Sequence, residues 1–306
     1  METLLLKALA DNLDLAVAYI EPKGNPRGIV QLVHGMCEHK ERYYPFMEFL
    51  SENGYVCVIH DHRGHGGSVK CADDLGYMYD GGWDAMVEDV EVVRKWSSDK
   101  WPELKRILFG HSMGSMVVRS YTKRYDSHID TLIVCGSPSA NPAAGAGKIL
   151  ARLTAAFSKK GWHHRPAILQ RMSFGSFNKP FENEGFPSAW VCSDQETLKA
   201  YHKDPLCQFV FTSNGFYNLL CLMQYCYSEK GWAMKNPKLK VRFISGEMDP
   251  CRGTDKQHQA SVELMKKVGY TDVDSRIFPK MRHEILNETE RHTVWNHVLD
   301  IISEGD

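Results

Sequence analysis

ILFGHSMGSM, residues Ile107 to Met116, joins a short apolar run to an amphipathic one through the frame Gly-x-Ser-x-Gly. A strand that enters a helix directly through this frame holds its serine in a strained turn, and the flanking residues are small because the two backbones nearly touch. The turn lifts the hydroxyl of Ser112 clear of the sheet edge, where the helix N-terminus favours developing negative charge. We therefore interpret Ser112 as a nucleophile flanked by Gly110 and Gly114, and not as an ordinary helix N-cap.

Short apolar runs alternate with helical patterns on either side of this turn. Four runs between residues 28 and 140 are rich in Val and Ile and end in turn residues: GIVQLVHG, YVCVIHDHRGHG, RILFGHSMG and IDTLIVCGSPSA. Runs of this length are typical of buried parallel strands. Between them, residues 84–97 and the residues after Ser112 place apolar side chains at helical spacing. The alternation predicts the α/β class, with a mostly parallel, doubly wound sheet.

The alternation stops at about residue 141 and resumes at about residue 238. The residues between contain Gly and Ala turns, aromatic stretches such as SFGSFNKPF, and weakly patterned helices. After them, KVRFISGEMDP and DSRIFP are typical of strands, and residues 254–268 and 289–303 of helices. We therefore predict a core formed by residues 1–140 and 238–306, with residues 141–237 inserted as a helical cap between strands six and seven.

The composition narrows the class of protein. The chain of 306 residues has a formal net charge of -1, which gives no general attraction to nucleic acid or to an anionic membrane. Nine cysteines without a C-x-x-C pair, several of them in apolar runs, indicate reduced and mostly buried thiols. The first twenty residues lack the pattern of a signal peptide, and no stretch approaches the about 18 apolar residues of a membrane span. We expect a cytoplasmic protein with no metal and no cofactor.

A serine needs a base to lose its proton near neutral pH. In a strand-turn-helix arrangement of this kind the base follows the last strand, and RIFPKMRHEIL places His283 in that loop. The other histidines considered lie on expected helices or in turns at the carboxyl end of the sheet, where we expect packing or local hydrogen bonds: His258, His292, His297, His34, His65 and His111. His283 is therefore the predicted base.

The third member of such a set is a carboxylate after the penultimate strand. Asp249, at the end of VRFISGEMDP, has this position, and we prefer it to Glu247. The order Ser112, Asp249, His283 along the chain is the one that this fold requires. Asp249 would accept the Nδ1 proton of His283 and so fix its tautomer and stabilise the imidazolium.

Acyl transfer also requires N–H donors for the oxyanion. The residue after the nucleophile supplies one, which makes the N–H of Met113 a candidate. The second comes from the loop after the first long buried strand, IVQLVHGMCEH. There the pair His34-Gly35 allows a sharp turn that aims the N–H of Met36 inward.

Five stretches occur in a fixed order along the chain: HGMCEHKERY (34–43), DHRGHGGS (61–68), GHSMGS (110–115), SGEMDP (245–250) and RHEILNE (282–288). Together they resemble the α/β-hydrolase superfamily, and within it the monoacylglycerol lipase and lysophospholipase-like serine hydrolases. The resemblance implies a cap between strands six and seven and an oxyanion hole formed by Met36 and Met113. It also implies that Glu38 and Arg42 form a structural pair behind the oxyanion loop, although this spacing equally suits a solvated helical pair.

The predicted cap combines aromatic and methionine side chains with positive charge. Residues 141–180 contain seven Lys or Arg and no Asp or Glu, which suits an anionic head group, an anionic membrane surface or a solvated basic face. We expect a minority of the large apolar side chains to line an acyl pocket and the rest to pack the cap: Phe157, Trp162, Met172, Phe174, Phe177, Phe181, Phe186, Trp190, Phe216 and Met223.

Three functions from different classes fit these features. The first is hydrolysis of carboxylic esters of monoacylglycerol or lysophospholipid type through an acyl-enzyme on Ser112, with a short-chain carboxylesterase as an alternative. The second is a proline-iminopeptidase-like aminopeptidase, for which the cap offers no clear acidic subsite beyond Glu182 and Glu184. The third is a non-catalytic ligand receptor on the same scaffold. We favour the first, with a small-molecule acyl ester as substrate, no nucleic acid partner, and transient contact between the cap and a membrane surface.

Overall fold

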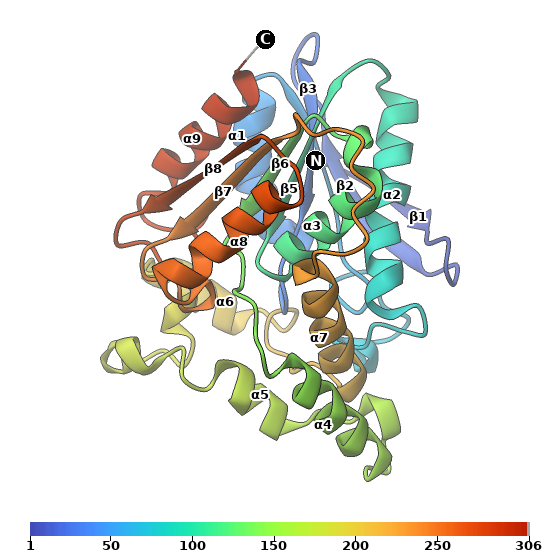
Figure 1. Ribbon diagram of the computed structural model, residues 1–306, viewed down its shortest axis with the longest axis vertical. Coiled ribbons are helices and arrows are strands. Elements are labelled where there is room, and N and C mark those ends of the chain that lie inside the picture. The colour runs from blue at the N-terminus through green and yellow to red at the C-terminus, as the bar shows by residue number, and fades with distance from the viewer. Residues whose placement is uncertain (305–306) are drawn as a thin grey trace.

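The computed structural model describes residues 1–304 and places their strands in a single sheet (Figure 1). The spatial order of the strands is β1-β2-β4-β3-β5-β6-β7-β8. Their bounds are β1 (Glu2–Lys7), β2 (Asp14–Ile20), β3 (Gly28–Val33), β4 (Tyr55–His60), β5 (Lys105–His111), β6 (Thr131–Cys135), β7 (Lys240–Gly246) and β8 (Asp272–Phe278).

Two strand pairs, β1–β2 and β2–β4, are antiparallel, and the remaining pairs are parallel. The predicted mostly parallel sheet is therefore confirmed. Strands β3, β4 and β6 are buried along their whole length, which explains why they are apolar without alternation. Because β3 through β8 run in the same direction, the loops that follow them meet at one edge of the sheet.

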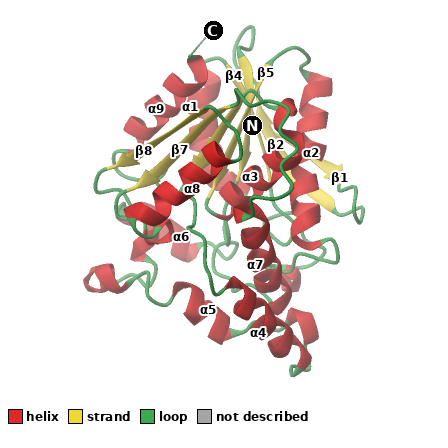
Figure 2. Cartoon of the chain, viewed as in Figure 1, coloured by secondary structure: helices red, strands yellow, loops and turns green. Residues whose placement is uncertain are grey.

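Helices cover both faces of the sheet (Figure 2). On one face Phe46 of α1 and Trp295 of α9 pack with Phe109 of β5. On the other face Met86 of α2 and Val117 of α3 belong to a second core, which also contains Leu108 of β5. The bounds are α1 (Tyr44–Glu52), α2 (Gly82–Lys100), α3 (Met113–Tyr125), α8 (Asp255–Lys267) and α9 (Arg291–Ser303).

The residues between β6 and β7, 136–239, are mainly helical and are called here the β6–β7 segment. It contains α4 (Ala144–Ala156), α5 (Ala167–Phe174), α6 (Gln195–Lys203) and α7 (Ser213–Tyr227). Figure 1 shows α4 and α5 at the end of the molecule that lies beyond the carboxyl ends of the strands. Helix α7 packs against α3, so that Phe216 and Leu222 join the core of the sheet. The division into core and cap at residues 140/141 and 237/238 remains a prediction.

The helices were compared with the length and hydrophobicity of a membrane span. Within residues 1–304, no helix combines the length and the apolar character that crossing a bilayer requires.

Four histidines lie buried together where β3 and β4 end: His34, His60, His62 and His65. The rings of His34 and His62 are 4.5 Å apart between centroids, and those of His34 and His65 are 5.3 Å apart. The backbone N–H of His62 donates to Nε2 of His34 at 3.0 Å, which orders the two loops. Burial lowers the pKa of all four rings, to about 4 for His60 and His65. The folded protein therefore holds these imidazoles neutral.

We expect the free energy of unfolding to decrease as the pH falls from about 6.5 to about 4. In this window the unfolded chain binds protons at these histidines and the folded chain does not, so the free energy of unfolding rises with pH. At pH 4, His60 and His65 each lower the free energy of unfolding by about 3 kcal/mol relative to its value at neutral pH. His111 opposes this partly, because its pKa is raised in the folded state.

Urea denaturation of the wild type and of His60→Leu at pH 5 and pH 7 measures this effect. The variant should lose part of the pH dependence. Equal free energies of unfolding for the wild type at the two pH values would contradict the assignment.

Candidate active site

The turn between β5 and α3 has the strained geometry expected for the Gly-x-Ser-x-Gly frame. Ser112 has a φ of +54°, a left-handed backbone conformation that L side chains rarely adopt. A Cβ on Gly110 would lie 2.5 Å from the carbonyl oxygen of Gly114. A Cβ on Gly114 would overlap the carbonyl oxygens of Val33 and His34. Both positions therefore require glycine because backbones meet there.

The three side chains predicted as nucleophile, base and acid lie within hydrogen-bond distance of one another. Nε2 of His283 is 2.8 Å from Oγ of Ser112, and Nδ1 of His283 is 2.9 Å from Oδ1 of Asp249. Asp249 is fixed in turn by the backbone N–H of Cys251, which donates to it at 2.8 Å. Because the Asp249 carboxylate accepts the Nδ1 proton, Nε2 is left free to accept the proton of Ser112. Loops after β5, β7 and β8 supply the three residues.

The loop after β3 approaches Ser112 closely. A Cβ on Gly35 would lie 2.9 Å from Cβ of Ser112, so only glycine fits there. Met36 and Met113 line the same cavity as Ser112. The N–H of Met113 lies in the first turn of α3, where the helix itself offers no acceptor. This arrangement suits two N–H groups converging on an oxyanion, and their role remains a prediction.

Glu38 joins the oxyanion loop to the residue before the nucleophile. Its carboxylate accepts hydrogen bonds from the Gly35 N–H, from Tyr43 at 2.9 Å and from Nδ1 of His111 at 3.1 Å. Burial would raise the pKa of Glu38, but His111 and Arg42 lower it to about 2. Glu38 is therefore ionised at neutral pH.

Both ring nitrogens of His111 face groups that only accept hydrogen bonds. Nδ1 faces the Glu38 carboxylate, and Nε2 lies 3.2 Å from the backbone carbonyl of His283. Although burial acts in the opposite direction, the Glu38 carboxylate raises the pKa of His111. Both contacts favour the protonated form of His111, which links Glu38 to the backbone of the predicted base.

The expected pair of Glu38 and Arg42 forms, with Nη1 of Arg42 3.1 Å from the Glu38 carboxylate. Arg42 also binds Glu284 through two hydrogen bonds of 2.6 Å. Sequence reasoning missed Glu284, although its place next to His283 was a signal for a role at the site. A forked pair of this kind fixes the loop that carries His283 against the oxyanion loop.

A cavity of about 1160 Å³ opens beside Ser112. Its wall is mostly apolar and combines residues near the nucleophile with residues of the β6–β7 segment. Of the ten cap residues considered from the sequence, four line it: Phe174, Phe177, Trp190 and Met223. The other six do not, because they are exposed at the surface or packed in clusters of their own: Phe157, Trp162, Met172, Phe181, Phe186 and Phe216. Sequence reasoning missed Phe209, Leu219 and Leu220, which also line it.

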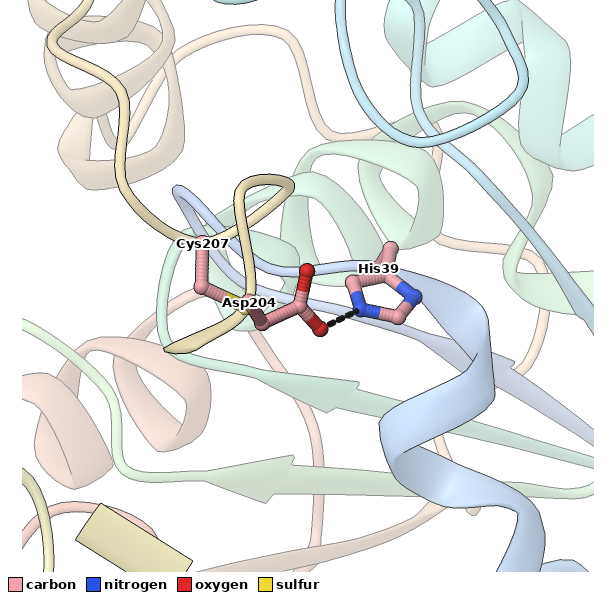
Figure 3. Close-up of side chains that lie close together, drawn as sticks. All are labelled: His39, Asp204 and Cys207. Carbon is pink, nitrogen blue, oxygen red and sulfur yellow. Dashed lines mark hydrogen bonds and ion pairs between the residues drawn. The ribbon is translucent and has the colours of Figure 1, made fainter. Parts of the chain in front are cut away.

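One group outside the triad brings together the residue types that bind metals. Figure 3 shows His39, from the loop after β3, pointing toward Asp204, with Cys207 on the same loop as Asp204. Nε2 of His39 lies 2.7 Å from Oδ2 of Asp204, so the two already bind each other. Burial raises the pKa of the Cys207 thiol, and a protonated thiol is a poor metal ligand. We interpret the group as an ion pair that ties the β6–β7 segment to the loop after β3.

Replacing Gly114 with alanine should lower the free energy of unfolding by about 2 kcal/mol, because the new methyl group meets two backbone carbonyls that cannot move independently. Gly145→Ala is the matched control, since its Cβ would meet only the side chain of Gln224 at 3.5 Å, and alanine favours the helix. Chemical denaturation measures both. A Gly114→Ala protein as stable as the control would show that the backbones do not meet as described.

Comparisons with known proteins bear on the family and the fold. A monoacylglycerol lipase of Mycolicibacterium smegmatis is 27% identical over 281 residues, covering 92% of this chain and 90% of the relative. The crystal structure of a thermostable carboxyl esterase from Bacillus coagulans, in complex with glycerol, superposes with a TM-score of 0.86 at 26% identity and covers 98% of each chain.

A soluble variant of monoglyceride lipase from Saccharomyces cerevisiae, with a substrate analogue, superposes with a TM-score of 0.73 over 99% of this chain and 94% of that one. At 19% identity this likeness shows the fold alone. The family model described as serine aminopeptidase, S33, matches residues 24–290, which is most of the chain. The protein therefore belongs to the serine aminopeptidase S33 family, a family with the α/β-hydrolase fold.

Proposed function

We propose that the protein hydrolyses carboxylic esters of monoacylglycerol or lysophospholipid type through an acyl-enzyme on Ser112. The observation that carries the proposal is the hydrogen-bonded chain from Asp249 through His283 to Ser112, which ends in a large apolar cavity. The relatives named as monoacylglycerol lipase and carboxyl esterase support the same reaction class.

In the proposed mechanism Nε2 of His283 accepts the proton of Ser112 as Oγ attacks the ester carbonyl carbon. The carbonyl oxygen becomes an oxyanion that the N–H groups of Met36 and Met113 stabilise; one such donor is worth about 3 kcal/mol. His283 then gives its proton to the leaving alcohol, and Ser112 remains acylated. A water molecule, deprotonated by His283, attacks the acyl-enzyme. Collapse of the second oxyanion breaks the bond between the acyl carbon and Oγ, and His283 returns the proton to Oγ of Ser112 as the acid leaves.

Asp249 has two tasks in this cycle. Its hydrogen bond to Nδ1 keeps His283 in the tautomer that can accept a proton at Nε2. Its negative charge also stabilises the imidazolium formed at each step. Asp249 and His283 are 2% and 4% exposed, so this charge interaction takes place largely out of water.

The size of the cavity favours lipid esters over short-chain esters. A volume of about 1160 Å³ exceeds that of the about 300–1,000 Å³ pockets that hold drug-sized ligands. A long acyl chain fills such a space and buries apolar surface along its whole length.

An aminopeptidase would need an acidic subsite for the free amino group of its substrate, and the described residues do not provide one in the cavity. Glu184 is bound to the guanidinium of Arg282, and neither it nor Glu182 lines the cavity. A free amino group in the cavity would therefore meet no unpaired carboxylate, which supports the ester substrate.

Ser112→Ala should reduce turnover of p-nitrophenyl esters by at least about a thousandfold, because the nucleophile is lost. Ser173→Ala, a change in the cavity wall, is the control and should retain activity.

The substrates for this assay are p-nitrophenyl esters of increasing chain length, from acetate to palmitate, and an aminoacyl anilide. Long-chain esters should be the best substrates. Faster hydrolysis of the anilide than of every ester would reverse the proposal.

We also propose that α4, α5 and the residues between them contact a membrane surface during catalysis. Six large apolar side chains of this region are exposed: Ile149, Leu153, Phe157, Trp162, Ile168 and Met172. Phe157 is 88% exposed. Lysines and arginines of residues 141–180 lie among them, a combination that binds anionic interfaces.

Phe157→Asp should weaken binding to phosphatidylglycerol vesicles by at least about tenfold, because burial of one phenylalanine side chain is worth about 1.5–3 kcal/mol. Leu9→Asp is the control, because Leu9 is 77% exposed but lies near β1. Vesicle co-sedimentation measures both, and equal binding of the two variants would argue against this surface.

A further inference from the structure

Two acidic and two arginine side chains line the cavity. The acidic ones are Glu38 and Glu284, and Arg42 binds both, at 3.1 and 2.6 Å. The arginines are Arg165 and Arg171, and among the described residues neither lies within 4.0 Å of a carboxylate. The part of the wall that contains Arg165 and Arg171 therefore presents positive charge that no carboxylate pairs.

Arg165 is held in place by backbone carbonyls. Its Nη1 donates to the carbonyl of Leu75 at 2.7 Å and to that of Val210, and its Nη2 donates to that of Asp73 at 3.0 Å. A guanidinium has five N–H groups, of which these bonds use three, so two remain for a ligand. Because its orientation is fixed before a ligand arrives, binding costs less entropy.

Arg165 lies near the oxyanion loop. The thiol of Cys37, the residue after Met36, donates to the carbonyl of Phe209 at 3.1 Å, and Arg165 binds the carbonyl of the next residue, Val210. Burial raises the pKa of the Cys37 thiol, and Arg165 acts in the opposite direction, as a nearby cation does. An ester whose carbonyl oxygen is bound at Met36 thus has this positive charge close to its reacting end.

Arg171, on α5, carries the second positive charge. It is exposed, and its side chain forms no hydrogen bond with the described residues. Gln170, the residue before Arg171, lines the same wall. Leu219, Leu220 and Met223 form an apolar part of the cavity that suits an acyl chain. The polar wall is then left for the alcohol part of the ester.

We propose that the preferred substrates are acyl esters of a phosphorylated alcohol, with Arg165 and Arg171 binding the phosphate. The proposal rests on the ester hydrolysis proposed above. Guanidinium groups match the geometry and charge of a phosphate, and hydrogen bonds between charged groups are stronger than neutral ones. Neutral glycerol esters would leave both cations without a counter-charge.

The test compares 1-octanoylglycerol with 1-octanoylglycerol 3-phosphate, both below their critical micelle concentrations so that attraction to an interface plays no part. Release of octanoate gives kcat/KM for each ester. The wild type should prefer the phosphate ester by about tenfold or more. Arg171→Gln should lower this ratio toward one, chiefly by lowering kcat/KM for the phosphate ester. Arg165→Gln should do the same, and Arg171→Gln carries the test if Arg165→Gln does not fold.

Lys159→Gln is the matched control, because Lys159 is an exposed cation of the same basic stretch that does not line the cavity. It should leave the ratio unchanged. A wild-type ratio near one, or a preference for phosphate that survives Arg171→Gln, would overturn the inference and leave ester hydrolysis intact. A wild type that cleaves neither ester would overturn both.

Discussion

The site depends on the close approach of two backbones, the end of β3 and the first turn of α3. Gly114 rests directly on the carbonyl groups of Val33 and His34, with no room for a side chain. This contact sets the distance between Ser112 and the loop that carries Met36. A serine in a strained conformation is retained there because the sheet beneath it holds both segments.

Electrostatic interactions also hold the loops of the site in place. Glu38 lies behind the oxyanion loop, where it holds the Gly35 N–H and pairs with His111. His111 in turn reaches the backbone of His283, and Arg42 clamps Glu284. Loops after β3, β5 and β8 are therefore joined by one network of buried charges. Such a network is stable only when every member is paired, so the loops are constrained as a unit.

The fold and the meeting of Ser112, Asp249 and His283 could be predicted from sequence for a simple physical reason. Each residue lies in the turn or loop after a parallel strand, and parallel strands bring their carboxyl ends to one edge. Register and loop length leave little freedom for such residues. The position of the loop after β3 was predictable for the same reason, since it also follows a strand, and its role as an oxyanion loop remains a prediction.

The cavity could not be predicted in the same way. Its wall comes largely from the β6–β7 segment, where short helices and loops show no simple period and a residue's direction depends on tertiary contacts. Apolar character alone did not separate Trp190, which lines the cavity, from Phe181, which packs in its own cluster. The partners of Arg165 lie far from it in sequence, so its lack of a carboxylate was visible only in the structure.

The contact between His39 and Asp204 links the wall of the cavity to the loop after β3. His39 follows Glu38 on that loop, and Asp204 ends α6, which contributes Tyr201 and His202 to the cavity wall. Any displacement of α6 must therefore either break this contact of 2.7 Å or move the loop that carries Met36. The shape of the space for the substrate and the position of the groups beside Ser112 thus depend on each other.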